Sequence, residues 1–113
     1  MRQERLVYLD FITCYSKDFG FAESINGKNS SKKSEITLRR KKIKNAISEL
    51  VINGFVKPLD RQNGRFFEIT SSGKLFADSL SSEYGNKYRA ISKTVLYHFS
   101  NKTDKELLDL ILD

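Results

Sequence analysis

Basic side chains are concentrated in one segment of the sequence, and their chemistry suits the binding of phosphate groups. Residues 26–44 include eight lysines and arginines and a single acidic residue, Glu35. The rest of the 113-residue chain has 12 basic and 13 acidic side chains, so the net charge of +6 originates in this segment. Such a concentration of positive charge attracts phosphate-rich partners, and it favours a nucleic acid as the ligand.

Nine basic side chains are predicted to contact the DNA backbone, seven within this segment and two in a turn further along the chain. The nine are Lys28, Lys32, Lys33, Arg39, Lys41, Lys42, Lys44, Arg61 and Arg65. Lysines at this density neutralise phosphate charge and carry little information about base sequence. The pattern therefore predicts a phosphate-binding surface more than a reader of DNA sequence.

Side chains that could perform catalysis or bind a metal form no recognisable motif. The chain has one cysteine, Cys14, and one histidine, His98, and its carboxylates are scattered. The phosphate-binding loop Gly-x-x-x-x-Gly-Lys-Ser/Thr is absent. We interpret Cys14 as a small buried hydrophobic residue and Asp10 as a buried hydrogen-bonding group. The sequence predicts no enzyme activity, no catalytic residue, no metal site and no cofactor.

The cellular location is predicted from signals that the sequence lacks. The N-terminal residues have neither the apolar core nor the cleavage site of a signal peptide. No apolar run approaches the roughly 18 residues that a bilayer crossing needs. A cytoplasmic protein without membrane contact is expected.

Helices must position the basic segment, and the spacing of apolar residues predicts where they lie. Apolar residues three and four apart predict a helix over residues 3–16, followed by a polar loop over residues 17–34. A second helix is expected over residues 37–53, with Ser34 or Thr37 as its cap. The basic segment would then be partly loop and partly helix.

A β-hairpin is predicted after the second helix. Two β-rich runs, residues 55–59 and 65–70, flank a turn that ends in Asn63 and Gly64. Pro58 has no amide donor, so its strand is expected at a sheet edge.

Three more helices are predicted after the hairpin. The first is expected to be capped by Ser71 or Ser72 and broken by Gly85, and a second follows over residues 88–99. The last is expected to start with a capping box of Thr103 and Glu106. The inner face of the first of these helices is expected to include Leu75 and Leu80.

Together these elements predict a mainly α fold with a small β-hairpin wing, arranged as a winged helix-turn-helix core plus C-terminal helices. The core is expected over residues 1–84, including the basic loop 17–34. The C-terminal helices, residues 85–113, are expected to pack on the core or on a partner, within a single domain overall.

Several short motifs carry a resemblance to a known family. They are RLVYLDF at residues 5–11, ESI at 23–25, LRRKKI at 38–43, GFV at 54–56, FEIT at 67–70 and SEY at 82–84. With Gly64, Gly73, Phe76 and Leu80, they make residues 4–97 similar to the middle component of ABC-three-component systems. These are small accessory subunits of Lamassu-type bacterial antiphage complexes, whose other parts are an SMC-like ATPase and an effector, often a nuclease.

The resemblance implies a non-catalytic accessory subunit that bridges the SMC-like ABC ATPase and the effector and contacts the DNA backbone. The candidate partner-binding residues lie in the last helix, and they are Leu107, Leu108, Ile111 and Leu112. The alternative is that this helix folds back onto the core of its own chain.

Two other functions remain open at the level of sequence. One is a free-standing winged-helix transcriptional regulator, whose helix 37–53 enters a major groove. The exposed face of that helix offers mainly lysines beside Asn45 and Ser48, which argues mildly against base reading. The other is a protein-binding scaffold whose charges only face solvent.

Overall fold

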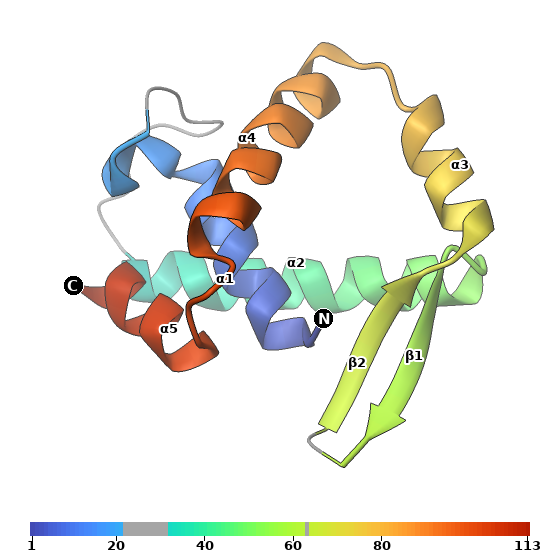
Figure 1. The fold of residues 1–113 in the computed structure, drawn as a ribbon, viewed down its shortest axis with the longest axis horizontal. Helices are drawn as coiled ribbons and strands as arrows, with labels where there is room; N and C mark the ends of the chain where they lie inside the picture. The colour runs from blue at the N-terminus through green and yellow to red at the C-terminus, as the bar shows by residue number, and fades with distance from the viewer. Residues whose placement is uncertain (22–31, 63) are drawn as a thin grey trace.

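The protein is mainly helical, with one two-stranded hairpin. The computed structural model describes residues 1–21, 32–62 and 64–113 (Figure 1). Within these residues the elements are α1 (Gln3–Cys14), η1 (Ser16–Phe19), α2 (Lys32–Ile52), β1 (Val56–Arg61), β2 (Gly64–Ile69), α3 (Ser71–Ser79), α4 (Glu83–Phe99) and α5 (Asp104–Leu112). The predicted fold class, mainly α with a small β-hairpin, is confirmed. A helix-turn-helix would involve residues 22–31, which lie outside the described residues, so that part of the arrangement stays a prediction.

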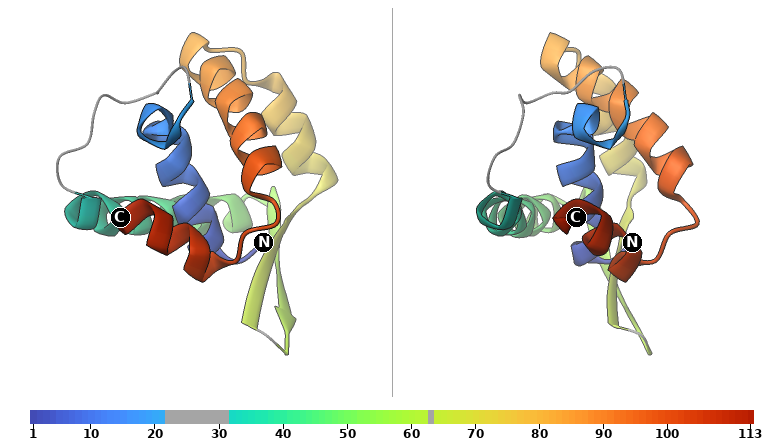
Figure 2. Two further views of the ribbon diagram at one scale, coloured as in Figure 1. Left: turned by 60° about the vertical axis from the view of Figure 1, so that its left-hand side comes forward. Right: turned by 90° about the vertical axis from the view of Figure 1, so that its left-hand side faces the viewer.

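Helix α1 lies at the centre of the molecule and packs against α2, α4 and α5, and α5 also contacts α2 (Figures 1 and 2). Residues 7–16 are all buried, as expected for a helix that is packed on every side. The core around it combines Val7, Phe11, Ile12 and Cys14 with Ile36 of α2, Val95 and Phe99 of α4, and Leu107 and Ile111 of α5. The predicted boundary at residues 84/85 falls inside α4, and elements on both sides of it contribute to this one core.

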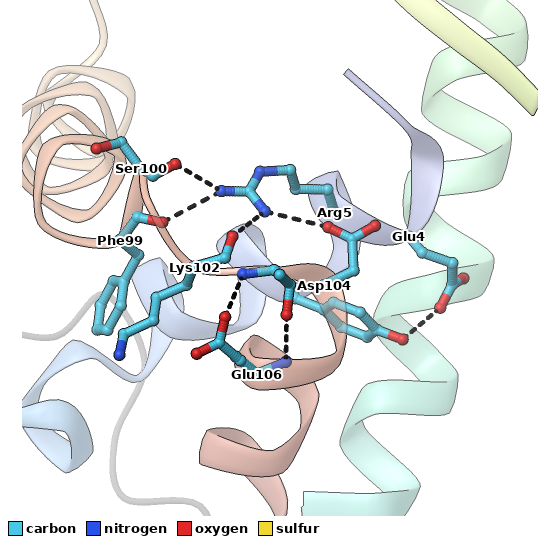
Figure 3. Close-up of polar contacts among 9 residues, drawn as sticks. Glu4, Arg5, Phe99, Ser100, Lys102, Asp104 and Glu106 are labelled. Atoms are coloured by element: carbon cyan, nitrogen blue, oxygen red, sulfur yellow. Dashed lines mark hydrogen bonds and ion pairs between the residues drawn. The ribbon is translucent and has the colours of Figure 1, made fainter. Parts of the chain in front are cut away.

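Arg5 of α1 joins the central helix to the connection between α4 and α5 (Figure 3). Its Nη1 donates to the Lys102 carbonyl at 2.7 Å and to Asp104 Oδ1 at 3.1 Å, and its Nη2 donates to the Phe99 carbonyl at 3.1 Å. The last carbonyls of a helix lack intrahelical partners and favour a nearby cation. The guanidinium therefore satisfies the end of α4 and fixes the start of α5.

The corner between the hairpin and α3 depends on Thr70. Its hydroxyl donates to the Gly54 carbonyl at 2.7 Å and accepts from the Gly73 amide at 3.0 Å. Thr70, and not Ser71 or Ser72, is therefore the N-cap of α3, which corrects the prediction. A Cβ at Gly73 would lie 2.0 Å from the Phe55 carbonyl oxygen, so this close approach requires glycine.

The hairpin pairs residue 56 with 69 and residue 61 with 64, in antiparallel register. Pro58 stands opposite Phe67, and the Phe67 amide points the other way, to the Met1 carbonyl at 2.8 Å. The Met1 amino group donates to the Phe67 carbonyl at 2.9 Å. The backbone groups of Phe67 therefore do not depend on Pro58, and the missing N–H of Pro58 breaks no hydrogen bond between the two strands here.

The helix boundaries differ from the predictions in the basic segment. Helix α2 begins at Lys32, so Ser34 and Thr37 are inside it and cap nothing. The Thr37 hydroxyl donates back to the Lys33 carbonyl at 3.1 Å, a bond typical of threonine within a helix. Residues 32–34, predicted as loop, are helical.

The region around Gly85 also differs from the prediction. Helix α3 ends at Ser79, and Ser82 caps α4 by accepting a hydrogen bond from the Gly85 amide at 2.9 Å. Gly85 therefore lies in the first turn of α4 and does not break a helix. Leu75 and Leu80 are 73% and 47% exposed, so their predicted inward orientation was wrong.

Candidate nucleic-acid interface

The outward side of α2 carries a row of lysines. Helix α2 buries only Ile36 and Ile47, so most of its 21 residues face solvent. At about 100° per residue, Lys33, Lys41 and Lys44 fall within about 80° of one another around the helix axis. All three are exposed, and none forms an ion pair with a described residue. We call these three residues the lysine row.

Lys42 is equally exposed but lies about 100° round the helix from Lys41. Lys32 is half-buried, and its ammonium donates to the backbone carbonyl of Asp113. Lys28 lies outside the described residues. The predicted basic cluster is thus divided between different surroundings, and among its described members the lysine row shares one side of α2.

Arg39 and Arg40 connect α2 to α1. The Arg39 guanidinium, 15% exposed, lies 3.2 Å from Glu35 and 3.7 Å from Asp10. Arg40 approaches both carboxylate oxygens of Glu4, with Nε–Oε1 at 2.9 Å and Nη2–Oε2 at 3.1 Å. Both arginines are occupied by carboxylates of their own chain. The predicted DNA contact of Arg39 stays a prediction to which this geometry lends no support.

The two arginines of the hairpin lie at its tip, which projects from the helical body (Figure 1). Arg61 is exposed, and Arg65 pairs with Asp60, directly opposite in the register, at 2.9 Å. An exposed pair of this kind is weak and can exchange for a phosphate. The structure places these arginines on a separate element from the lysine row.

The last helix packs on its own core. Leu107 and Ile111 are fully buried against α1, and Leu108 is half-buried. Leu112 is 43% exposed. This is the arrangement in which α5 folds back on its own chain, so Leu107 and Ile111 could contact a partner only by leaving the core.

Asp10 is buried near Cys14 and Tyr88. Burial, followed by the nearby charge of Asp10, raises the pKa of Cys14 to about 12. The thiol is therefore protonated and unreactive, and the predictions for Cys14 and Asp10 as buried structural residues are confirmed. Across residues 1–21, 32–62 and 64–113, no three histidine, cysteine or carboxylate side chains gather as a metal site. Nor does any helix of these residues have the length and apolar character to cross a bilayer.

The polar contacts of three residues were not predicted from the sequence: Glu4, Arg5 and Tyr88. Each is paired with a residue at least 36 positions away, so no local pattern indicates its role. The pairing of Arg39 with Glu35 had a local signal, because a spacing of four places the two side chains together on a helix.

The described residues form a small helical protein with exposed lysines on one helix and arginines paired within the chain. Comparison with known families identifies the class of protein. The chain belongs to the ABC-three component (ABC-3C) system Middle Component 2 family, whose model matches residues 1–113. No curated protein and no solved structure matches the chain. The family match confirms the resemblance carried by the sequence motifs.

Proposed function

We propose that this chain is a non-catalytic, cytoplasmic accessory subunit of an SMC-like ABC ATPase antiphage complex. It bridges the ATPase and the effector, and the lysine row of α2 holds the DNA backbone. Membership of a middle-component family supports the role within a multi-part system. The observation that carries the DNA contact is the exposed lysine row, which has no ion pair with any described residue.

The helix that carries the lysine row is held in place by contacts on its opposite side. Ile36 and Ile47 bury one side of α2, and the pair of Arg40 with Glu4 joins the same helix to α1. A rigid strip of charges is better suited to a duplex backbone than a loop would be, because less conformational freedom is lost on binding. Phosphate contacts of this kind position a protein on DNA without reading its sequence.

The test is the salt dependence of DNA binding by the assembled complex. Changing Lys33, Lys41 and Lys44 together to glutamine should weaken binding. It should also make the slope of log K against log salt less steep by about 2.7, since each lost phosphate contact removes about 0.9. The matched control changes three exposed lysines on other elements, Lys74, Lys87 and Lys105, to glutamine. Both variants lose the same charge, so equal effects on the slope would exclude the lysine row as the DNA surface.

A further inference from the structure

Residues of α1, α2, the hairpin and α4 line a groove. Figure 1 shows how these elements lie relative to one another. The volume of the groove is about 320 Å³, at the lower end of the range of about 300–1,000 Å³ found for ligand sites. Its apolar lining comes from Met1 and from four elements: Leu6 of α1, Ile43, Ala46, Ile47 and Leu50 of α2, Val56 of β1, and Phe67 and Ile69 of β2. Ile69 is only half-covered, so the groove is open on the side of the hairpin.

The side-chain polar groups of the groove are a hydroxyl and two carboxylates. Tyr88 donates to Asp10, and the Arg39 guanidinium lies 3.7 Å from the second carboxylate oxygen. Glu68 is exposed and forms no ion pair within the described residues. Among the described lining residues there is no lysine, arginine or histidine, and their one cationic group is the Met1 amino group, which is already bonded to the Phe67 carbonyl. Asp10 is compensated by Arg39, so Glu68 is the groove carboxylate that favours a cation, and a complementary occupant is apolar with a positive charge at Glu68.

The hairpin edges favour a helix over an added strand as the occupant. On the outer edge of β2, both backbone groups of Phe67 are already bonded to Met1. On β1, Pro58 offers no amide donor for a ladder. A helix needs no backbone partner, since it lays only its apolar side chains into a groove.

We propose that this groove binds an amphipathic helix from another component of the same ABC-3C system. The apolar ridge of that helix lies on Ile47, Leu50 and Phe67, and a lysine or arginine beside the ridge pairs with Glu68. The proposal rests on the accessory role proposed above and adds the site at which one partner docks.

The test is co-purification with the other components of the system, co-expressed with a tagged chain. Ala46 lines the groove but is itself exposed, so Ala46→Trp fills the groove without disturbing the core. The matched control is Ser48→Trp, which lies about 160° away around α2. We expect Ala46→Trp to weaken the complex about tenfold or more, as blocking of a central contact does, and Ser48→Trp to leave it unchanged.

Charge is tested by a second matched pair. Glu68→Lys should weaken the complex, whereas Glu49→Lys, an equal change on an exposed residue outside the groove, should not. A photo-crosslinking residue at position 46 should form a bond with a helical segment of a partner, and the same residue at position 48 should not. The crosslink shows whether a partner helix occupies the groove even if Ala46→Trp fails to fold.

The outcomes separate this docking site from the accessory role. Complexes of equal strength with Ala46→Trp, Ser48→Trp and the unchanged chain would overturn the groove as a docking site and leave the accessory role intact. Failure of the unchanged chain to co-purify with any component would overturn both. A small apolar molecule found on the isolated chain by native mass spectrometry and displaced by Ala46→Trp, with the complex unaffected, would overturn the helix as occupant.

Discussion

Tyr88 of α4 donates a hydrogen bond to Oδ1 of Asp10 in α1, at a distance of 2.5 Å between the two oxygens. Burial raises the pKa of Tyr88 far above its ordinary value, and the negative charge of Asp10 raises it further. The hydroxyl therefore stays protonated and remains a donor at every physiological pH. The pair joins the first helix to the fourth across 78 positions of sequence.

Tyr88→Phe should destabilise the fold, because it removes the hydroxyl and leaves the buried Asp10 Oδ1 with only the weak thiol donor of Cys14, 3.8 Å away. The expected loss in the free energy of unfolding is about 1–3 kcal/mol, measured by urea denaturation. Tyr97→Phe is the control, since Tyr97 is 87% exposed, and it should change stability by less than about 0.5 kcal/mol. If Asp10→Asn and Tyr88→Phe had strictly additive effects, the two groups would not interact as described.

Cys14 should react with thiol reagents only when the protein opens. With its pKa raised to about 12, roughly one thiol in 10,000 is ionised at about pH 8, and the sulfur is also buried. Labelling by a disulfide reagent should be slow in buffer and rapid in concentrated urea. Rapid labelling of the folded protein would contradict the burial of this residue.

The pair of Glu4 and Arg40 should make a small, pH-dependent contribution to stability. The hydrogen bonds from Arg40 lower the pKa of Glu4, against an opposing effect of burial. A carboxyl with a lowered pKa stabilises the fold above its unfolded pKa of about 4.3, and this contribution is lost as the pH falls through the folded pKa. Arg40→Met should therefore cost about 0.2–1 kcal/mol at about pH 7, as expected for a partly exposed pair, and progressively less below about pH 4. Urea titrations of both proteins across this range measure the difference, and a cost that grew on acidification would contradict the assignment.

Gly73→Ala should destabilise the corner between the hairpin and α3. The added Cβ would meet the Phe55 carbonyl oxygen at 2.0 Å, and the backbone must shift to relieve the contact. We expect a cost of about 1–3 kcal/mol, typical of overpacking, in thermal or urea denaturation. Ser72→Ala, on the adjacent exposed residue, should have little effect. Equal stability of the two variants would show that α3 does not pack this closely on residue 55.

Leu107→Ala should lower the free energy of unfolding by about 2–5 kcal/mol, because Leu107 is fully buried in the core. Leu110→Ala makes the same chemical change on the outer side of α5, where the side chain is exposed, and should cost less than about 1 kcal/mol. The comparison distinguishes a helix that completes the core from one that is kept free for a partner. A stable Leu107→Ala protein that lost its partner would favour the second.

Local sequence patterns predicted the features that depend on neighbouring residues. The capping box of Thr103 and Glu106 is present because both of its hydrogen bonds close within four residues. The hairpin was likewise predictable from its turn. By contrast, three adjacent hydroxyl residues, 70–72, could all cap α3, and the choice of Thr70 depends on the Gly54 carbonyl, 16 residues earlier.

The candidate site was harder to predict because it depends on pairing between distant elements. Arg39, Arg40 and Lys41 are consecutive basic residues, and helix phase places the first two beside the apolar side of the helix and the third facing outward. In the structure the first two contact carboxylates of α1, and the third faces solvent. Helix phase separates outward from inward positions, but it does not show which acidic residues of the neighbouring helix pair with the inward arginines. The division of the basic cluster therefore required the packing of α1 against α2.

Helix α2 has two unlike sides, and this bears on the order in which partners could assemble. The lysine row and Ala46 lie about 140–160° apart around the same helix. A phosphate backbone and a polypeptide could therefore approach from opposite directions, without competing for space. If both bind, neither needs to leave before the other arrives, so DNA could be engaged before or after the assembly is complete. Any cooperativity between the two would have to be transmitted through the helix itself, and by linkage it would be the same in both directions.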